Sequence, residues 1–189
     1  RNYDGCRLEI DAPKVLLIGD NGSGKTNLME AVSLLAPGRG LRRAKAEHLP
    51  RQTTGRADWA VSARVTSGSE TVTLGTGVRA DSDGPRRVMR RDGETVSQAE
   101  VGRLFSVSWL TPRMDGIFID SPGARRRFLD RLVIAFDPAH IGRTSRYEKM
   151  LRERTTLLSE GRGDEAWLSA VEASLAESAV AVTAARQSL

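Results

Sequence analysis

The spacing of apolar positions changes along the chain, and each spacing predicts a type of element. A nearly continuous apolar run predicts a strand buried on both faces at Lys14–Ile18, and a shorter strand is expected at Leu8–Ile10. Apolar residues then recur at helical intervals from Asn27 to Leu35, and Pro37-Gly38 ends that segment. The start of the chain therefore predicts a strand, a loop and a helix in that order.

The middle of the chain partly alternates apolar and polar residues, which is typical of antiparallel strands and hairpins. The predicted strands are Trp59–Val65, Glu70–Leu74, Arg86–Arg91 and Glu94–Val96, with turns at Ala80–Pro85 and Asp92-Gly93. A short helix over Ser97–Leu104 and a buried strand over Phe105–Leu110 are expected next. The predicted fold class is α/β, with a sheet that has a parallel and an antiparallel part.

Helical spacing returns in the last third of the chain. Ser121-Pro122 predicts a helix start, with serine as N-cap and proline at the first helical position. Asp137-Pro138 repeats this signal, and Asp164 caps a third helix after the glycines that break the second. The apolar stripes are Phe128, Leu129, Leu132, Val133 and Phe136 in the first helix and Trp167, Leu168, Val171 and Leu175 in the third.

The second and third helices, joined by a short polar turn, predict an antiparallel hairpin. Either a short coiled coil or two ordinarily packed helices would fit, because the third helix is rich in alanine and shows no sustained heptad. We therefore expect two domains, a mixed α/β domain over residues 1–136 and the beginning of a helical arm over residues 137–189.

A complete P-loop pattern, G-x-x-x-x-G-K-[ST], lies between the first predicted strand and helix. It reads Gly19-Asp20-Asn21-Gly22-Ser23-Gly24-Lys25-Thr26. In such a loop backbone N–H groups cradle phosphates, Lys25 neutralises the β and γ oxygens, and the Thr26 hydroxyl is placed to bind Mg²⁺. The strand before the pattern and the helix after it disfavour a chance match in a glycine-rich turn. The sequence thus predicts binding of ATP with Mg²⁺.

The charge balance suits a polyanionic partner without proving one, since the net charge is +5 and the pI about 10.0. Arginines cluster at Arg39, Arg42 and Arg43, at Arg86, Arg87, Arg90 and Arg91, and at Arg125, Arg126, Arg127 and Arg131. Each cluster could equally be a solvated surface. No run of about 20 apolar residues and no signal-peptide pattern is seen, and the single cysteine excludes an internal disulfide. We expect a cytoplasmic protein without a membrane segment.

No other enzyme chemistry is indicated. His48 and His140 are isolated from potential metal ligands, no serine lies in a G-x-S-x-G turn, and Asp81 and Asp83 are best explained as turn formers. No catalytic residue is identified from the sequence.

Several blocks of sequence in a fixed order resemble the RecF family of recombination mediators. They are Arg1-Asn2-Tyr3, the P-loop extended to Asn27-Leu28-Met29-Glu30-Ala31, Pro37-Gly38-Arg39-Gly40-Leu41-Arg42, Leu110-Thr111-Pro112, the stretch Ser121 to Asp130, and Tyr147 to Arg154. The extended P-loop is shared with many ATPases related to structural maintenance of chromosomes (SMC) proteins. The blocks that contain Gly38-Arg39-Gly40-Leu41-Arg42 and Arg125–Asp130 are closer to RecF alone.

The resemblance implies an ABC-type, SMC-like ATPase head followed by a helical arm. Such proteins bind ATP, dimerise around it, hydrolyse it slowly and bind gapped or double-stranded DNA without sequence specificity. With the partners RecO and RecR they help to load the RecA recombinase in DNA repair, replication restart and the SOS response.

Residue by residue, the resemblance assigns Gly19, Asp20, Asn21, Gly22, Ser23, Gly24, Lys25, Thr26 and Asn27 to the nucleotide site. Thr111–Asp115 falls at the family's Q-loop but has no glutamine, which puts a metal- or water-positioning role in doubt. The signature motif, the acidic Walker B strand and the switch histidine are not recognisable. The chain starts without methionine and stops within a helical pattern, so we expect a piece of a longer protein that binds nucleotide weakly and does not hydrolyse it.

Arg39, Arg42 and Arg43 are predicted to contribute to a DNA-facing surface, because sequence-independent binding of duplex DNA rests on arginine and lysine. The Arg125–Arg127 run could pair with phosphates, with a second head or with carboxylates of its own chain. Other functions that fit the P-loop are another SMC-like DNA-repair ATPase, an ABC transporter subunit and a small-molecule kinase. The last two are poor matches, since neither a lid with a substrate base nor a transporter-like surface is seen.

Overall fold

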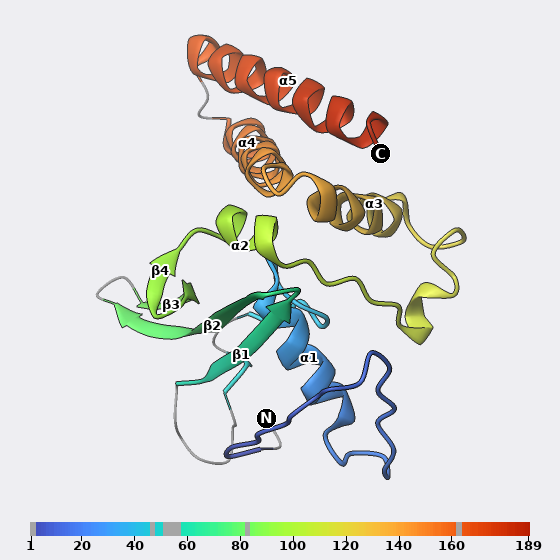
Figure 1. The fold of residues 1–189 in the computed structure, drawn as a ribbon. Helices are drawn as coiled ribbons and strands as arrows, with labels where there is room; N and C mark the ends of the chain where they lie inside the picture. Colours follow the sequence, from blue (N-terminus) through green and yellow to red (C-terminus); the bar gives the residue numbers. More distant parts are fainter. Residues whose placement is uncertain (1–2, 46–47, 51–57, 82–83, 162–163) are drawn as a thin grey trace. The chain divides into compact units, whose positions relative to one another are not determined.

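The computed structural model describes residues 3–45, 48–50, 58–81, 84–161 and 164–189. Its elements are α1 (Lys25–Leu35), β1 (Ala60–Ser67), β2 (Glu70–Asp81), β3 (Gly84–Arg91), β4 (Glu94–Val96), α2 (Gln98–Leu104), the 3-10 helix η3 (Pro112–Met114), α3 (Pro122–Phe136), α4 (His140–Glu160) and α5 (Glu165–Gln187) (Figure 1). The chain divides into two compact units, Arg1–Val107 and Ser108–Leu189. The proposed domain boundary after residue 136 stays a prediction.

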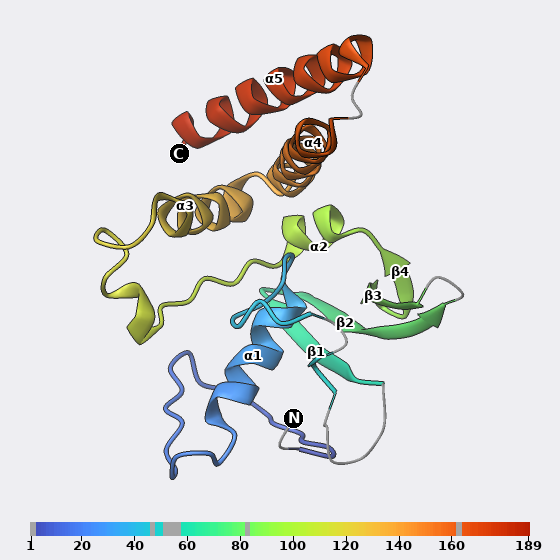
Figure 2. The same ribbon diagram turned by 180° about the vertical axis from the view of Figure 1, so that it is seen from behind.

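The first unit is built on an antiparallel sheet in the order β1-β2-β3-β4, which confirms the predicted hairpins. One face of this sheet carries the core, where Leu74 and Met89 pack with Leu35 of α1 and Val101 of α2. Figures 1 and 2 show α1 beside β1 and β2. The predicted helix after β4 is confirmed as α2, and Ser97 and Glu100 form a capping box at its start.

The predicted strands Leu8–Ile10 and Lys14–Ile18 are not formed. Neither segment takes part in a strand ladder, Lys14 lies in a bend, and Leu16 and Ile18 are 81% and 84% exposed. A strand needs the backbone of a neighbour for its hydrogen bonds, and no described segment supplies one here. Among the described residues the sheet is therefore antiparallel only, and the predicted parallel part is absent.

The prediction of a buried strand over Phe105–Leu110 is also wrong. The segment is extended without a strand partner, and Leu110 at its end is largely exposed. Its alternating half-buried and exposed residues show that it lies along a surface. An apolar run without a neighbouring strand thus forms a connection between the two units of the chain.

The second unit contains η3 and the packed helices α3, α4 and α5, which largely follow the predicted signals. Ser121 caps α3 through the backbone N–H of Ala124, as expected. Asp137 instead lies at the end of α3, and α4 begins three residues later at His140. Phe136 is 80% exposed, so the predicted apolar stripe of α3 ends before it.

α4 and α5 form an antiparallel hairpin, as predicted. Two ion pairs link the helices, Arg146 with Glu177 and Arg154 with Glu172. The arginine that comes later in α4 pairs with the glutamate that comes earlier in α5, as antiparallel packing requires. The buried positions of α5, Val171, Ser178 and Val182, together with the half-buried Leu168 and Leu175, follow alternating steps of three and four residues, and the other half-buried positions are Ser174, Ala179, Ala181, Ala185 and Arg186. This spacing favours the coiled-coil alternative, and Trp167 lies outside the seam because it is exposed.

By length and composition alone, α5 could cross a membrane, although Glu172 and Glu177 interrupt its apolar residues. This is weak evidence, because a core helix of a soluble protein passes the same test. α5 packs against α4 and carries Glu172 and Glu177 on its surface, which a lipid environment would disfavour.

A buried polar cluster joins the three helices of this unit. Asp130 of α3 accepts hydrogen bonds from His140 of α4 and, through both oxygens, from Arg186 of α5, each at 2.8 Å. Burial raises the pKa of Asp130, but the bonds from Arg186 and His140 outweigh it and hold that pKa below its ordinary value. The RecF-like block that ends at Asp130 thus supplies the residue that ties α3, α4 and α5 together.

Candidate nucleotide-binding site

The P-loop forms a turn that leads directly into α1. Gly24 is the N-cap, with a φ of 101°, and its carbonyl accepts from the N–H groups of Asn27 and Leu28. Ser23 N–H closes the turn on the Asp20 carbonyl at 3.2 Å. The N–H groups of Lys25 and Thr26, in the first turn, have no intrahelical acceptor, and the positive end of the helix dipole lies beside them. This arrangement suits a phosphate group.

Lys25 folds back over its own loop. Its ammonium group donates to the carbonyl of Gly19 and to that of Asp20, the latter at 2.8 Å. The side chain is thereby held above the loop, on the side where phosphate oxygens would replace the two carbonyls as partners. The predicted role of Lys25 as a phosphate ligand fits this position.

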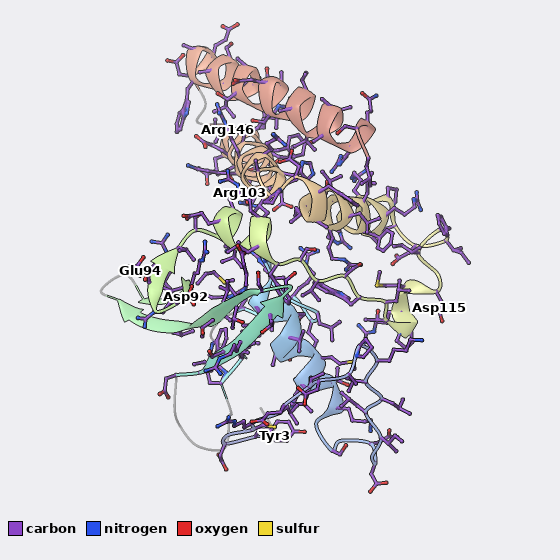
Figure 3. The ribbon with its side chains drawn as sticks, in the orientation of Figure 1. Tyr3, Asp92, Glu94, Arg103, Asp115 and Arg146 are labelled. Carbon is purple, nitrogen blue, oxygen red and sulfur yellow. The ribbon has the colours of Figure 1, made fainter. Side chains whose placement is uncertain are left out.

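Tyr3 supports the loop from outside, a contact that the sequence analysis missed. Its hydroxyl donates to the Ser23 carbonyl at 3.0 Å. A Cβ atom at Gly24 would lie 2.3 Å from that hydroxyl, so the tyrosine fills the space that the glycine leaves. Figure 3 labels Tyr3 in the N-terminal segment. Its place in the RecF-like Arg1-Asn2-Tyr3 block was the only signal in the sequence.

Thr26, the predicted Mg²⁺ ligand, is exposed next to Lys25. A single hydroxyl fits Mg²⁺, which is commonly bound by few protein oxygens together with substrate phosphates and water. No cluster of three acidic, histidine or cysteine side chains occurs among the residues that the structure describes. Thr26 therefore stays the predicted P-loop ligand of the ion, and a phosphate would have to complete the shell of the ion.

Arg42 is engaged with α1, which the sequence analysis did not foresee. Its guanidinium donates to Asn27 at 2.8 Å and to Glu30 at 3.1 Å. The Glu30 side chain is only 4% exposed, so this ion pair compensates a buried charge. Of the three predicted DNA contacts, Arg39 and Arg43 are exposed, whereas Arg42 has a structural role beside the nucleotide site.

Arg87 holds the other end of α1. It reaches from β3 and donates to the carbonyls of Leu34, Ala36 and Gly38, and to the Thr76 hydroxyl at 2.9 Å. Carbonyls at a helix C-terminus lack intrahelical donors, and a cation there also suits the helix dipole. Burial lowers the pKa of Arg87, yet an arginine stays charged at neutral pH. The strand alternation places Arg87 on the same face as Met89, which was the signal available in the sequence.

The predicted Q-loop segment Thr111–Asp115 lies in the second unit, where Pro112–Met114 form η3. In the nearby Arg125–Arg127 run, Arg125 donates to the carbonyls of Phe118 and Asp120, while the other two arginines are exposed. One of the alternatives for this run was pairing with carboxylates of its own chain. Arg125 does bond within its own chain, but its partners are backbone carbonyls and not carboxylates.

The chain is similar to several curated proteins. It is 46% identical over 187 residues to the DNA replication and repair protein RecF of Agrobacterium fabrum, covering 98% of the chain and 50% of that protein. It is 45% identical over 191 residues to the protein of that name from Mesorhizobium japonicum, covering 100% of the chain and 50% of that protein. The chain therefore spans about half the length of the curated relatives it matches.

Solved structures agree with this similarity, although no family model matches the chain. The fold matches that of the recombination mediator protein RecF-ATPrS in the RecFOR pathway, with a TM-score of 0.77 and 26% identity over 90% of this chain and 46% of that one. RecF-ATP of the same pathway matches with a TM-score of 0.74 and 26% identity, over 89% of this chain and 45% of that one. The predicted P-loop NTPase fold of the ABC ATPase type is thereby confirmed, and nearly the whole chain is similar to one half of RecF proteins.

Proposed function

We propose that the chain is the nucleotide-binding part of an ATP-dependent DNA repair and recombination mediator. The observation that carries this proposal is the P-loop at the start of α1, with Lys25 held above it and free N–H groups in the first helical turn. The RecF structures that it resembles are described with ATP and ATPrS, which supports the same ligand here.

In this role ATP with Mg²⁺ binds Gly19–Asn27, and Thr26 ligates the metal ion. When it binds, Mg²⁺ neutralises phosphate charge. In the whole protein ATP binding promotes formation of a homodimer, and this dimer binds gapped or double-stranded DNA. RecO and RecR act with it to load RecA, and the protein works in the cytoplasm during repair, replication restart and the SOS response.

Nucleotide binding is tested by titrating the purified protein with a fluorescent ATP analogue. We expect Lys25→Ala to weaken binding at least about tenfold, because a charge-assisted contact with phosphate is worth roughly 1.5–3 kcal/mol. Lys14→Ala, which removes an exposed lysine a few residues before the loop, is the matched control and should bind like the wild type. Equal affinity of Lys25→Ala and Lys14→Ala would refute the assignment of the site.

Hydrolysis and DNA binding are separate measurements. We expect this chain alone to release no phosphate from ATP, so rapid release that depends on Lys25 would contradict the proposal. For DNA, the Arg39→Ala/Arg43→Ala variant is preferable to the triple alanine variant, because Arg42→Ala would also remove the ion pair with the buried Glu30. Unchanged affinity of the double variant for gapped duplex DNA would exclude these two arginines from the DNA surface.

A further inference from the structure

The antiparallel sheet has a second face that no described helix of the first unit covers. The core residues Leu35 and Val101 pack on one side of the sheet, so the alternate positions point the other way. We call this side the outer face. Its described side chains and glycines are Ala60, Ser62, Arg64 and Thr66 of β1, Thr71, Thr73, Gly75 and Gly77 of β2, Arg86, Val88 and Arg90 of β3, and Thr95 of β4.

A groove of about 380 Å³ runs over this face. Its residues include Trp59, Ser62, Thr73 and Arg90, and its floor is formed at Gly75 and Gly77. Two glycines in the middle of a strand weaken it and commonly mark a place where another backbone or a ligand approaches closely. Glycine is required at position 77 by the packing of the sheet, because a Cβ there would lie 2.7 Å from the Trp59 carbonyl oxygen.

The packing of the sheet does not require glycine at position 75. A Cβ at this position would meet only ordinary contacts, at 3.7 Å from the Arg90 Cβ and 3.9 Å from the Val61 carbonyl. A β-branched residue would also stabilise a strand better than glycine does. The open floor at Gly75 is therefore not required by the packing of the sheet.

The outer face is basic. Arg64 and Arg90 are exposed and take part in no ion pair within the described part of the chain, and the same face carries hydroxyl groups from Ser62, Thr73 and Thr95. No described side chain at its strand positions is acidic. Asp92, at the β3–β4 turn labelled in Figure 3, already accepts from the Thr73 N–H and pairs with Arg91.

The spacing of the arginines favours a chain of phosphates over a single one. Arg90 is opposite Gly75, whereas Arg64 is opposite Thr73 and on the other side of β2. Neighbouring strands lie about 4.8 Å apart, so these two arginines stand on strands about 10 Å apart. Two backbone positions this far apart suit two separate phosphates of one polymer better than a clamp on one anion.

From these observations we propose that the outer face of β1–β3 binds the phosphate backbone of a nucleic acid, with Gly75 as the open floor of the groove, Arg90 as a phosphate contact in the groove and Arg64 as a second contact beside it. This inference rests on the proposed DNA-binding function and assigns that function a second surface, separate from Arg39 and Arg43.

Two variants test it in complementary ways. Arg64→Ala/Arg90→Ala removes both charges, whereas Gly75→Val closes the floor without changing the charge. The matched charge control is Arg146→Ala/Arg152→Ala, which removes two exposed arginines of α4. The purified protein with ATP is titrated against fluorescently labelled single-stranded, duplex and gapped DNA between about 50 and 200 mM salt, and circular dichroism confirms that each variant is folded.

We expect Arg64→Ala/Arg90→Ala to weaken binding about 30-fold near 100 mM salt and to reduce the slope of log K against log salt by about 1.4 to 1.8, the value for two phosphate contacts. Gly75→Val should weaken binding at least about fivefold, with the nucleotide affinity of both variants unchanged. Comparison of the affinities for single-stranded, duplex and gapped DNA shows which of these DNAs the groove accepts.

Wild-type affinity and salt slope in both test variants would overturn the groove proposal while leaving DNA binding by the protein intact. Equal losses in the Arg146→Ala/Arg152→Ala control would also overturn it, because the effect would then follow net charge alone. A wild-type protein that binds none of the three DNAs would refute both this inference and the proposed function on which it rests.

Discussion

Replacement of Arg87 by methionine tests how the P-loop helix is anchored. Methionine keeps much of the length of arginine but has no donor. It would leave the carbonyls of Leu34, Ala36 and Gly38 and the hydroxyl of Thr76 without the guanidinium that now serves them. The change therefore isolates the hydrogen bonds from the bulk of the side chain.

The expected loss follows from the number and type of these bonds. A hydrogen bond to a charged group contributes about 1.5–3 kcal/mol, and water can recover part of it at the exposed end of a helix. We expect the first unit to lose about 2–4 kcal/mol of unfolding free energy, which corresponds to about 10–25 °C for a unit of this size. Arg87→Lys should recover only a small part, because one ammonium cannot reach acceptors spread along the end of a helix.

Hydrogen exchange read by mass spectrometry locates the effect. Peptides from α1, β2 and β3 should lose protection in Arg87→Met, while peptides from α4 and α5 in the second unit serve as an internal reference. Arg86→Ala is the matched control, since Arg86 is the neighbouring arginine and is exposed on the opposite face. Saturating ATP should raise the melting temperature of both variants, because the P-loop lies at the other end of α1.

The reasoning would be refuted if Arg87→Met and Arg86→Ala differed by less than about 0.5 kcal/mol, the range typical of surface substitutions. A loss of protection spread equally over both units would also contradict it. In that case the arginine would not act through α1.

Three further predictions concern the loop and the arm. Gly24→Ala should abolish binding of a fluorescent ATP analogue, because a Cβ at a φ of 101° is strained and would lie 2.3 Å from the Tyr3 hydroxyl; combining it with Tyr3→Ala should restore only part of the affinity, since the backbone strain remains. Asp130 has a lowered pKa, so its contribution to stability is present above the ordinary carboxyl pKa of about 3.9 and is lost as the pH falls through the lower folded value; acid unfolding followed by circular dichroism should therefore be less steep in Asp130→Asn. Ser178→Ala should raise the melting temperature of the arm slightly, because this buried hydroxyl bonds only to the Ser174 carbonyl of its own helix and alanine has the higher helix propensity; a lower melting temperature would contradict this.

The elements predicted correctly are those whose causes are local in sequence. The hairpins from β1 to β4 follow from alternation and from turns such as Asp92-Gly93, and the caps Ser121 and Asp164 start helices beside the residues that they bond. The P-loop is local in the same sense, since its turn closes between Asp20 and Ser23. Short-range hydrogen bonds and periodicity suffice for all of them.

The incorrect predictions concern segments whose structure depends on distant partners. Lys14–Ile18 is apolar enough for a buried strand, but a strand forms only where another backbone pairs with it, and the described residues supply none. The seam of α5 was obscured because Ser178 takes a position where an apolar residue is expected, and its burial became visible only once α4 lay against it. Composition along one segment cannot reveal either fact.

The candidate site divides in the same way. The phosphate-binding loop could be predicted, whereas the residues that fix α1 could not, because their partners are far away in the chain. Arg87 lies about 50 residues after the carbonyls that it binds, and Tyr3 is 20 residues before Ser23. Only the alternation of β3 and the RecF-like first block gave a hint of these contacts.

These distant contacts determine what α1 can do. The helix is about 16 Å long and is fixed at three points, by Tyr3 on the loop before it, by Arg42 on Glu30 in its middle, and by Arg87 at its end. Two of these anchors lie in segments that also present exposed arginines, since Arg42 is next to Arg43 and Arg87 shares β3 with Arg90. When phosphates bind, they would replace the carbonyl partners of Lys25. If α1 shifts at that point, either these contacts break or the attached segments move together with the helix. Arg42 and Arg87, more than the loop itself, are the physical connection between the nucleotide site and the basic surfaces of the first unit.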